Sequence, residues 1–122
     1  MENIKINKYS EQRPWGEFEQ FTHGEPTTIK ILTIQPGESL SLQYHNKRSE
    51  YWKVIFGWGK ITVEDTVHNA TEGDEFLINK GEKHRIETDS SKIKVLEISF
   101  GDFDENDIVR IEDKYNRIPN KK

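Results

Sequence analysis

The chain of 122 residues contains no cysteine, a single methionine and no long apolar run. Without cysteine it cannot form a disulfide, a cysteine-ligated zinc site, an iron–sulfur cluster or a thiol nucleophile. No fully apolar stretch exceeds the length of Val54–Phe56, which is far too short to cross a bilayer. A basic and then apolar leader is also missing, so we expect a cytoplasmic protein without membrane contact.

The sequence also lacks an excess of positive charge. It has 18 lysines and arginines against 22 acidic residues, which gives a net charge of −4. Binding to nucleic acid requires a concentrated basic face, so we expect no nucleic-acid partner. A small anionic ligand remains compatible with this composition, because a few arginines can gather locally in an acidic protein.

Short segments with β-branched or alternating residues fill most of the chain, and glycines and polar turns separate them. Seven segments carry this signal: residues 28–34, 40–45, 51–56, 60–64, 75–78, 84–88 and 93–100. No segment keeps an apolar period of 3.6 residues over three turns, and only the stretch from about Glu105 to Tyr115 favours a short helical turn. Strands at this spacing predict an all-β sandwich or barrel.

Glu50 lies in an otherwise apolar row. Residues two apart on a strand face the same way, so Glu50 shares its face with Trp52, Val54 and Phe56. Burying an uncharged polar group without a hydrogen bond costs roughly 2–7 kcal/mol, and burying an unpaired carboxylate costs more. Glu50 therefore requires a metal, a cation or hydrogen-bond donors beside it.

Three further side chains are suitable metal ligands. Gln43 and His45 share one face of their segment, together with Lys47 if the strand extends that far, and His84 stands two residues before Ile86. With Glu50 they form a mixed nitrogen and oxygen donor set, which suits zinc, manganese, iron, cobalt or nickel. Hydrophobicity alone does not decide which face of residues 40–45 is interior. The alternative to a metal site is that these histidines are ordinary hydrogen-bonded residues.

Five segments together resemble one known family. They are Arg13–Glu19, Pro36–His45, Arg48–Trp52, Gly73–Arg85 and Asp107–Arg117. The second and third resemble the first cupin signature, and the fourth resembles the second signature, with a histidine in the metal-ligand place. The outer two are similar to the ends of the phosphomannose isomerase domain of bifunctional mannose-1-phosphate guanylyltransferases.

This resemblance implies a cupin jelly-roll β-barrel (a double-stranded β-helix) and one divalent metal ion, with zinc first. We expect a single cupin domain over residues 1–122, with its core at about 13–117. The implied reaction interconverts mannose 6-phosphate and fructose 6-phosphate, in the synthesis of GDP-mannose and polysaccharide precursors. No nucleotidyltransferase domain fits in 122 residues, so we expect a stand-alone isomerase. Cupins commonly pair through a sheet, which by analogy implies a homodimer.

The resemblance places the metal ligands at Gln43, His45, Glu50 and His84. Lys47 stands where the family usually has a second histidine, and Asn79 where the second signature has a proline. A protonated lysine cannot ligate a metal. Two outcomes follow. Either the glutamine completes the site, as in the zinc site of single-function phosphomannose isomerases, or the site is weak and catalysis is lost.

We assign catalytic roles to Lys47 and Glu50, and phosphate binding to Arg48 and Arg110. The catalytic base stays open among Lys47, Glu87 and a metal-bound hydroxide. The two arginines have ordinary surface ion pairs as their alternative. In place of an isomerase, the chain fits a non-catalytic cupin that binds a sugar phosphate or sugar nucleotide, or a sugar-nucleotide isomerase or epimerase.

Overall fold

The computed structural model describes residues 8–101, 103–104 and 106–117, and this part of the chain contains strands and no helix. The strands are β1 (Tyr9–Arg13), β2 (Gly16–Gln20), β3 (Thr27–Ile34), β4 (Leu42–Tyr44), β5 (Arg48–Phe56), β6 (Trp58–Val63), β7 (Thr66–Thr71), β8 (Glu75–Ile78), β9 (His84–Glu87), β10 (Ile93–Gly101) and β11 (Val109–Glu112). None of the described residues belongs to a helix with the length and hydropathy of a membrane span.

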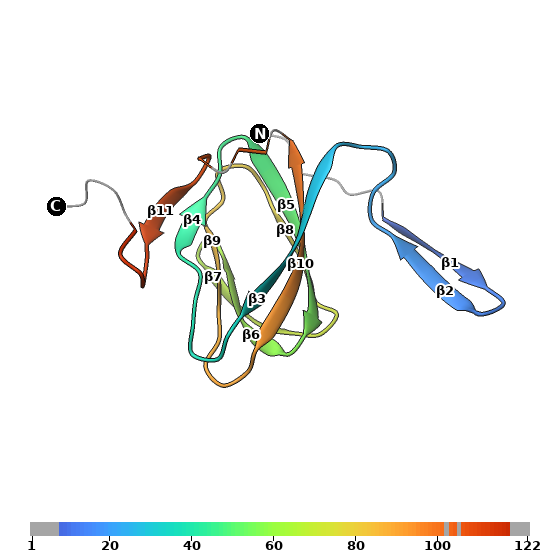
Figure 1. Cartoon of the computed structure of the whole chain (residues 1–122), viewed down its shortest axis with the longest axis horizontal. Coiled ribbons are helices and arrows are strands. Elements are labelled where there is room, and N and C mark those ends of the chain that lie inside the picture. Colours follow the sequence, from blue (N-terminus) through green and yellow to red (C-terminus); the bar gives the residue numbers. More distant parts are fainter. Residues whose placement is uncertain (1–7, 102, 105, 118–122) are drawn as a thin grey trace.

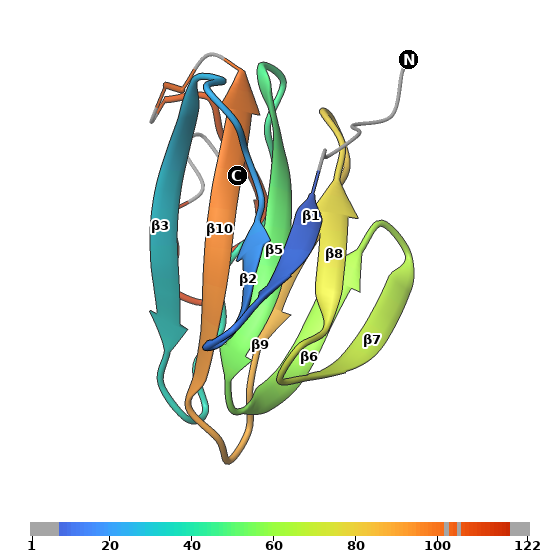
Figure 2. The ribbon, with the colours of Figure 1, turned by 90° about the vertical axis from the view of Figure 1, so that its right-hand side faces the viewer.

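Two antiparallel sheets face each other and form a barrel (Figures 1 and 2). One sheet has the strand order β3-β10-β5-β8, and the other has the order β11-β4-β9-β6-β7. Strands β1 and β2 form a separate hairpin that projects from the barrel (Figure 1). Except for the consecutive strands β6 and β7, the neighbours in both large sheets are not consecutive in the sequence, as in a jelly roll.

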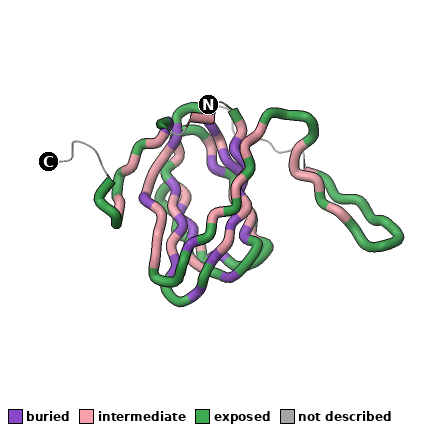
Figure 3. The backbone as a smooth tube through the Cα atoms, in the orientation of Figure 1, coloured by how far each residue is buried: buried purple, intermediate pink, exposed green. Residues whose placement is uncertain are grey.

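The inward faces of the two sheets meet in one apolar core. Its buried members include Ile34, Val54, Ile61, Ile86 and Ile93. Figure 3 shows the buried positions inside the barrel strands, whereas the hairpin is almost entirely exposed. Burial alternates along barrel strands such as β9, with every second side chain turned into the core.

The seven strands expected from the sequence are all present. Two regions were not predicted as strands: Thr66–Thr71 forms β7 after the polar turn, and Tyr9–Gln20 contains the β1–β2 hairpin. Strand β7 follows β6 through two residues, of which Glu64 adopts a left-handed conformation (φ 55°). A two-residue hairpin turn requires such a conformation. The sequence has glutamate at this position and not the glycine or asparagine that usually indicates such a turn.

The helical turn expected between about Glu105 and Tyr115 is wrong for the described residues, because Val109–Glu112 is strand β11. This strand pairs with β4 at the edge of the five-stranded sheet. The Asp107 carboxylate accepts hydrogen bonds from the amides of Asn46 and Lys47, both 2.8 Å long. These bonds hold the chain beside β4, where an unpaired sheet edge supplies backbone partners that the sequence does not reveal.

Candidate metal centre

Three ionisable side chains converge at one end of the barrel interior. Glu50 lies near the start of β5, His84 begins β9, and His45 follows β4 directly. All three are buried, and each offers a ligand atom within 4.8 Å of the others. Of the four metal ligands expected from the sequence, the structure thus brings these three together inside the barrel.

Glu50 lies between the two imidazoles. Its Oε2 is 3.5 Å from His45 Nε2, and its Oε1 is 3.7 Å from His84 Nε2. Zinc–nitrogen and zinc–oxygen bonds of about 2.0–2.2 Å place ligand atoms about 3–3.5 Å apart. The two separations between Glu50 and the histidines are close to that spacing, and all three ligand atoms lie within 4.8 Å of one another, so the three residues fit a common ion after side-chain adjustments.

Backbone carbonyls fix the tautomer of both histidines. His45 Nδ1 lies 2.6 Å from the carbonyl oxygen of Asp107, and His84 Nδ1 lies 2.9 Å from that of Glu82. A carbonyl only accepts, so each Nδ1 carries the proton and each Nε2 presents a lone pair toward Glu50. Metal-ligating histidines in proteins are oriented in this way by their second nitrogen.

Burial keeps both rings neutral. Desolvation lowers the pKa of His84 to about 4 and lowers the pKa of His45 as well. Among the buried polar atoms of the described residues, His84 Nε2 has no hydrogen-bond partner. A buried acceptor without a partner costs about 1–3 kcal/mol, and a metal ion would relieve this cost. The donor set and this orphaned nitrogen therefore fit a divalent cation.

Gln43 lies beside the three residues, on the same inward face. It is the direct cross-strand partner of His84 on one side and of Arg110 on the other. Cross-strand partners point to the same face of a sheet. The Gln43 Oε1 accepts a 2.5 Å hydrogen bond from Ser41 Oγ. Its role as a fourth ligand stays a prediction.

Arg48 is part of this centre and lies in the interior. Its Nε donates to Glu50 Oε2 at 3.1 Å, and its Nη2 donates to His45 Nε2 at 3.3 Å. The Arg48 side chain is buried. Desolvation raises the pKa of Glu50, and the positive charge of Arg48 beside it partly offsets this effect. The guanidinium therefore uses two of the lone pairs that an ion would need.

The other two predicted cations lie differently. Lys47 is 58% exposed, with Nζ 3.7 Å from Asp104 Oδ2. Arg110 is half-buried on the inward face of β11, and its Nε has no hydrogen-bond partner. Glu87, a candidate base, is half-buried three positions along β9 from His84, and its Oε2 lies 3.5 Å from Arg85 Nε. The structure thus separates Lys47 from the buried groups. It places Arg110 beside Gln43, on the same face of the sheet.

Glu97 is a site residue that the sequence reasoning missed. It lies on β10, opposite Trp52 of β5 and Lys30 of β3, and is buried. Desolvation, reinforced by the neighbouring charge of Glu50, raises the pKa of Glu97 to about 7. Its signal was available, because Glu97 shares the parity of Ile93 and Val95, just as Glu50 shares that of Trp52.

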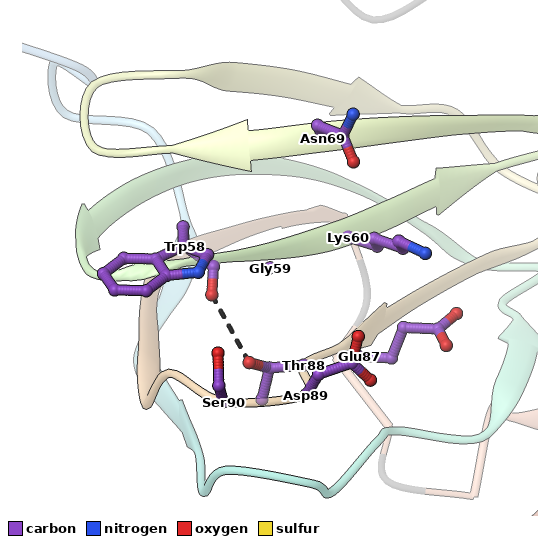
Figure 4. Close-up of a pocket in the computed structure, with 8 residues that line it drawn as sticks. All are labelled: Trp58, Gly59, Lys60, Asn69, Glu87, Thr88, Asp89 and Ser90. Atoms are coloured by element: carbon purple, nitrogen blue, oxygen red, sulfur yellow. Dashed lines mark hydrogen bonds between the residues drawn. The ribbon is translucent and has the colours of Figure 1, made fainter.

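A surface hollow lies between β6, β7 and the end of β9 with the turn that follows it (Figure 4). Trp58 and Lys60 of β6 line it, with Glu87 and Asp89 from the end of β9 and the turn after it. In the register of the two strands, His84 pairs with Val63 at the far end of β6. The hollow therefore contains none of the candidate metal ligands.

A family model described as "Mannose-6-phosphate isomerase C-terminal" matches residues 2–113 of this sequence. The chain belongs to this family. The resemblance inferred from the five sequence segments is confirmed by this match.

Curated relatives of this mannose-6-phosphate isomerase C-terminal chain are much longer. Mannose-1-phosphate guanylyltransferase ManC of Salmonella typhimurium is 34% identical over 108 residues, which cover 87% of the chain and 22% of the relative. The xanthan biosynthesis protein XanB of Xanthomonas campestris is 36% identical over 107 residues, covering 86% of the chain and 23% of that protein. The chain thus spans less than a quarter of these relatives.

Solved structures show the cupin fold. Oxalate decarboxylase from Bacillus subtilis matches with a TM-score of 0.64 and 24% identity over 71% of this chain and 24% of that one. At this identity the likeness concerns the fold alone. The prediction of a cupin jelly-roll barrel is confirmed, apart from the C-terminal helical turn.

Proposed function

We propose that the chain is a metal-dependent isomerase that interconverts mannose 6-phosphate and fructose 6-phosphate. It would work in the cytoplasm, in the supply of GDP-mannose for polysaccharide synthesis. The observation that carries the proposal is the buried group of His45, Glu50 and His84, with both Nε2 lone pairs turned toward the carboxylate. Membership of the isomerase family supports the choice of reaction.

Interconversion of an aldose and a ketose moves one proton between two adjacent carbons and one between their oxygens. The enediol formed on the way has a carbon–carbon double bond made from the electron pair of the broken C–H bond. A divalent ion held by His45, Glu50, His84 and Gln43 would supply a Lewis acid that polarises the substrate carbonyl. We propose zinc, with manganese, iron, cobalt or nickel as alternatives that share the donor set.

The chain's own residues would orient the ligand atoms and bind the substrate phosphate. Trp52 Nε1 donates to Glu50 Oε1 at 3.1 Å and, with the Asp107 and Glu82 carbonyls, fixes the directions of the ligand atoms. Arg110, inward beside Gln43, is the first choice for the substrate phosphate. Lys47, exposed where the chain enters β5, is either a second cation for the phosphate or the proton acceptor. Replacing Lys47 would raise KM if it binds the phosphate, and would lower kcat if it is the base.

A second candidate is a cupin that binds a sugar phosphate or sugar nucleotide without turnover. The observation that favours it is Arg48, whose guanidinium already supplies positive charge beside Glu50 and His45. Lysine at position 47, where the family usually has histidine, also agrees with a lost activity. A sugar-nucleotide isomerase or epimerase is less well supported, because the described residues include no acid–base histidine pair beyond the two candidate ligands.

The test combines metal content with turnover. Purified protein is loaded with zinc and dialysed, and its metal content is measured with the formation of fructose 6-phosphate from mannose 6-phosphate. We expect about one ion per chain, and we expect His84→Ala to lose the ion and at least about a hundredfold in kcat/KM, because Lewis-acid stabilisation contributes several kcal/mol. His68→Ala, in the half-buried histidine that packs on Phe76, is the control.

Each result decides between the candidates. A chain that binds zinc and sugar phosphate without turnover is a binding cupin. A chain that retains no ion after loading with any of the five metals contradicts the metal centre. Turnover that survives His84→Ala contradicts the role of this centre in catalysis.

A further inference from the structure

Trp58 is a large exposed side chain that belongs to neither the apolar core nor the candidate metal centre. It is 59% exposed, and Gly57 and Gly59 flank it in the chain. A Cβ atom at Gly57 would collide with the Lys92 carbonyl oxygen, and one at Gly59 would lie 2.6 Å from the Glu87 carbonyl oxygen. The two glycines therefore let the chain on both sides of Trp58 pack closely against the turn after β9, while the indole stays at the surface.

Hydrogen bonds fix the same turn beside Trp58. Thr88 Oγ1 donates to the Ser91 carbonyl oxygen at 2.5 Å and lies 3.4 Å from the Trp58 carbonyl oxygen (Figure 4). The Trp58 amide lies 3.4 Å from Ser91 Oγ. The wall of the hollow that contains Trp58 is thus already formed in the free chain, as in most sites for small molecules.

Polar side chains from three neighbouring strands line the rest of this hollow (Figure 4). Asn69 on β7 and Glu87 on β9 are the direct cross-strand partners of Lys60 on β6, so the three side chains share one face of the sheet. This is the outer face, because Ile86, which precedes Glu87, is buried. Asp89 adds a second carboxylate from the turn. An amide, an ammonium and two carboxylates therefore lie close to one exposed indole.

The hollow and the metal centre lie on opposite faces of the five-stranded sheet. Glu87 is three positions from His84 along β9, which turns their side chains to opposite faces and separates them by roughly 10 Å along the strand. His84 is buried inside the barrel, whereas Glu87 borders the outer hollow. A molecule bound in the hollow would therefore not touch the candidate metal ligands.

Size and charge restrict what the hollow can bind. Its volume is about 130 Å³, and a protein cavity of about 150 Å³ accommodates benzene, a single six-membered ring. Among the lining residues, the ammonium of Lys60 stands against the carboxylates of Glu87 and Asp89, so no excess of positive charge is present for a phosphate. The ligand that fits is an uncharged ring with an apolar face for the indole and several hydroxyls for the polar groups.

We propose that this hollow binds a neutral pyranose ring, either a free hexose or one unit of a glycan. The C–H groups on one face of such a ring would stack on the electron-rich face of the Trp58 indole. Its hydroxyls would donate to the carboxylates of Glu87 and Asp89 and accept from Asn69 and Lys60. A second hollow of about 530 Å³ shares Trp58 with the first and has room for the next unit of a glycan. The site does not depend on the proposed reaction.

Nuclear magnetic resonance of the full chain tests binding at this position. The indole N–H signals of the three tryptophans are assigned sequentially. They are then followed during titration with the methyl α-glycosides of mannose, glucose and galactose, and with the α-linked trisaccharide of the sugar that binds best. We expect a saturable shift of the Trp58 signal with at least one glycoside. The signal of Trp52, which bonds to Glu50 in the metal centre, should not shift with it.

Variants measure the contribution of the proposed contacts. Trp58→Ala removes the stacking surface, and we expect its dissociation constant, taken from backbone amide signals, to rise at least about tenfold. Trp15→Ala is the matched control, since Trp15 is also exposed, at 72%, but lies between β1 and β2. Its dissociation constant should equal that of the parent chain. Circular dichroism shows whether each variant keeps its strands, and Asn69→Leu, on the exposed side of β7, replaces Trp58→Ala if that protein fails to fold.

The outcomes separate the two sources of the ring. A trisaccharide that binds at least about tenfold more tightly than its single unit indicates a glycan, and a smaller difference indicates the free hexose. The proposal is overturned if none of the three glycosides shifts the Trp58 signal saturably, or if Trp58→Ala or its replacement keeps the parent affinity. Tighter binding of mannose 6-phosphate than of methyl mannoside at Trp58 also overturns it, because the charge of the hollow opposes a phosphate. Zinc content and turnover report on the other proposal separately.

Discussion

The two ends of the barrel interior are built on the same strands but filled with opposite chemistry. Along β5 the inward residues change from Glu50 to Val54, and along β9 from His84 to Ile86. Strand β10 runs the other way and changes from Val95 to Glu97. One end is thus a closed apolar core, and the other gathers two imidazoles, two carboxylates and a guanidinium out of contact with water.

This difference shows how a small chain maintains a costly site. Buried ionisable groups oppose folding unless they are paired, and removing one partner of a buried pair costs about 3–5 kcal/mol. The apolar end supplies stabilisation of about 25 cal/mol for each Å² removed from water. We therefore expect substitutions at the apolar end to change stability, and substitutions at the polar end to change metal affinity and pH dependence.

The largest expected effect is on stability, from Ile86→Ala. Ile86 is fully buried, two residues from His84 on the same face of β9. Truncating a buried isoleucine costs about 2–5 kcal/mol through lost transfer energy and a cavity. Urea unfolding of the metal-free protein measures the change, and Val67→Ala, on the exposed side of β7, should change it by less than about 0.5 kcal/mol. The folded variant should still bind one zinc ion; loss of the ion would show that the two ends are not separable.

An intermediate effect is expected from Glu97→Gln. The folded-state pKa of Glu97 is raised to about 7 from an ordinary value of 4.5. Its contribution to stability is therefore complete below about pH 4.5 and is lost as the pH rises through 7. Glutamine stays neutral, so the variant should gain up to about 3 kcal/mol at pH 8 and nothing at pH 4.

Unfolding of the metal-free protein at both pH values measures this gain. The exposed residue Glu72 provides the control substitution Glu72→Gln, for which we expect no difference between the two pH values. A Glu97→Gln variant that is equally stabilised or destabilised at pH 4 and pH 8 would mean that folding does not raise the pKa of Glu97, and that the polar end is less dry than its burial indicates.

The smallest expected effect is on metal affinity, from Arg48→Met. The Arg48 guanidinium donates to both Glu50 and His45, so an ion must break these bonds before it binds. Methionine donates no hydrogen bond, and zinc should bind about tenfold more tightly, which corresponds to about 1.4 kcal/mol. Competition with a chelating dye measures this affinity.

Arg85→Met is the matched control, since Arg85 bonds to Glu112 at 3.1 Å near the surface. Its zinc affinity should equal that of the parent chain. Weaker binding by Arg48→Met would show instead that the guanidinium positions the ligands, and the contrast between the two ends would then include a cation that helps the metal.

The fold was largely predictable because periodicity is a local signal. The alternation in residues 93–100 and the aromatic row after Glu50 located β10 and β5 with small errors in their bounds. The segment after Asn106 was misjudged as a helical turn, because its hydrogen-bond partner is β4, more than sixty residues away. Short polar segments carry no information about which sheet edge lies beside them.

Part of the candidate site was predictable for a similar reason. A carboxylate in an apolar row identified Glu50, and the same criterion applied to β10 would have identified Glu97. The position of Arg48 was not accessible in this way. A charged residue next to a signature reads as a surface or phosphate-binding group, whereas the structure turns it inward to Glu50.

Local sequence by itself determined the strands, the face on which Glu50 lies and the donor types available to a cation, because each depends only on alternation along a few residues. Tertiary structure alone decided that His45, Glu50 and His84 meet, that a guanidinium bonds to two of them, and that the β1–β2 hairpin projects from the barrel. These outcomes depend on pairing between strands far apart in the chain, and the energy of such pairing depends on register and sheet packing, which no single segment encodes.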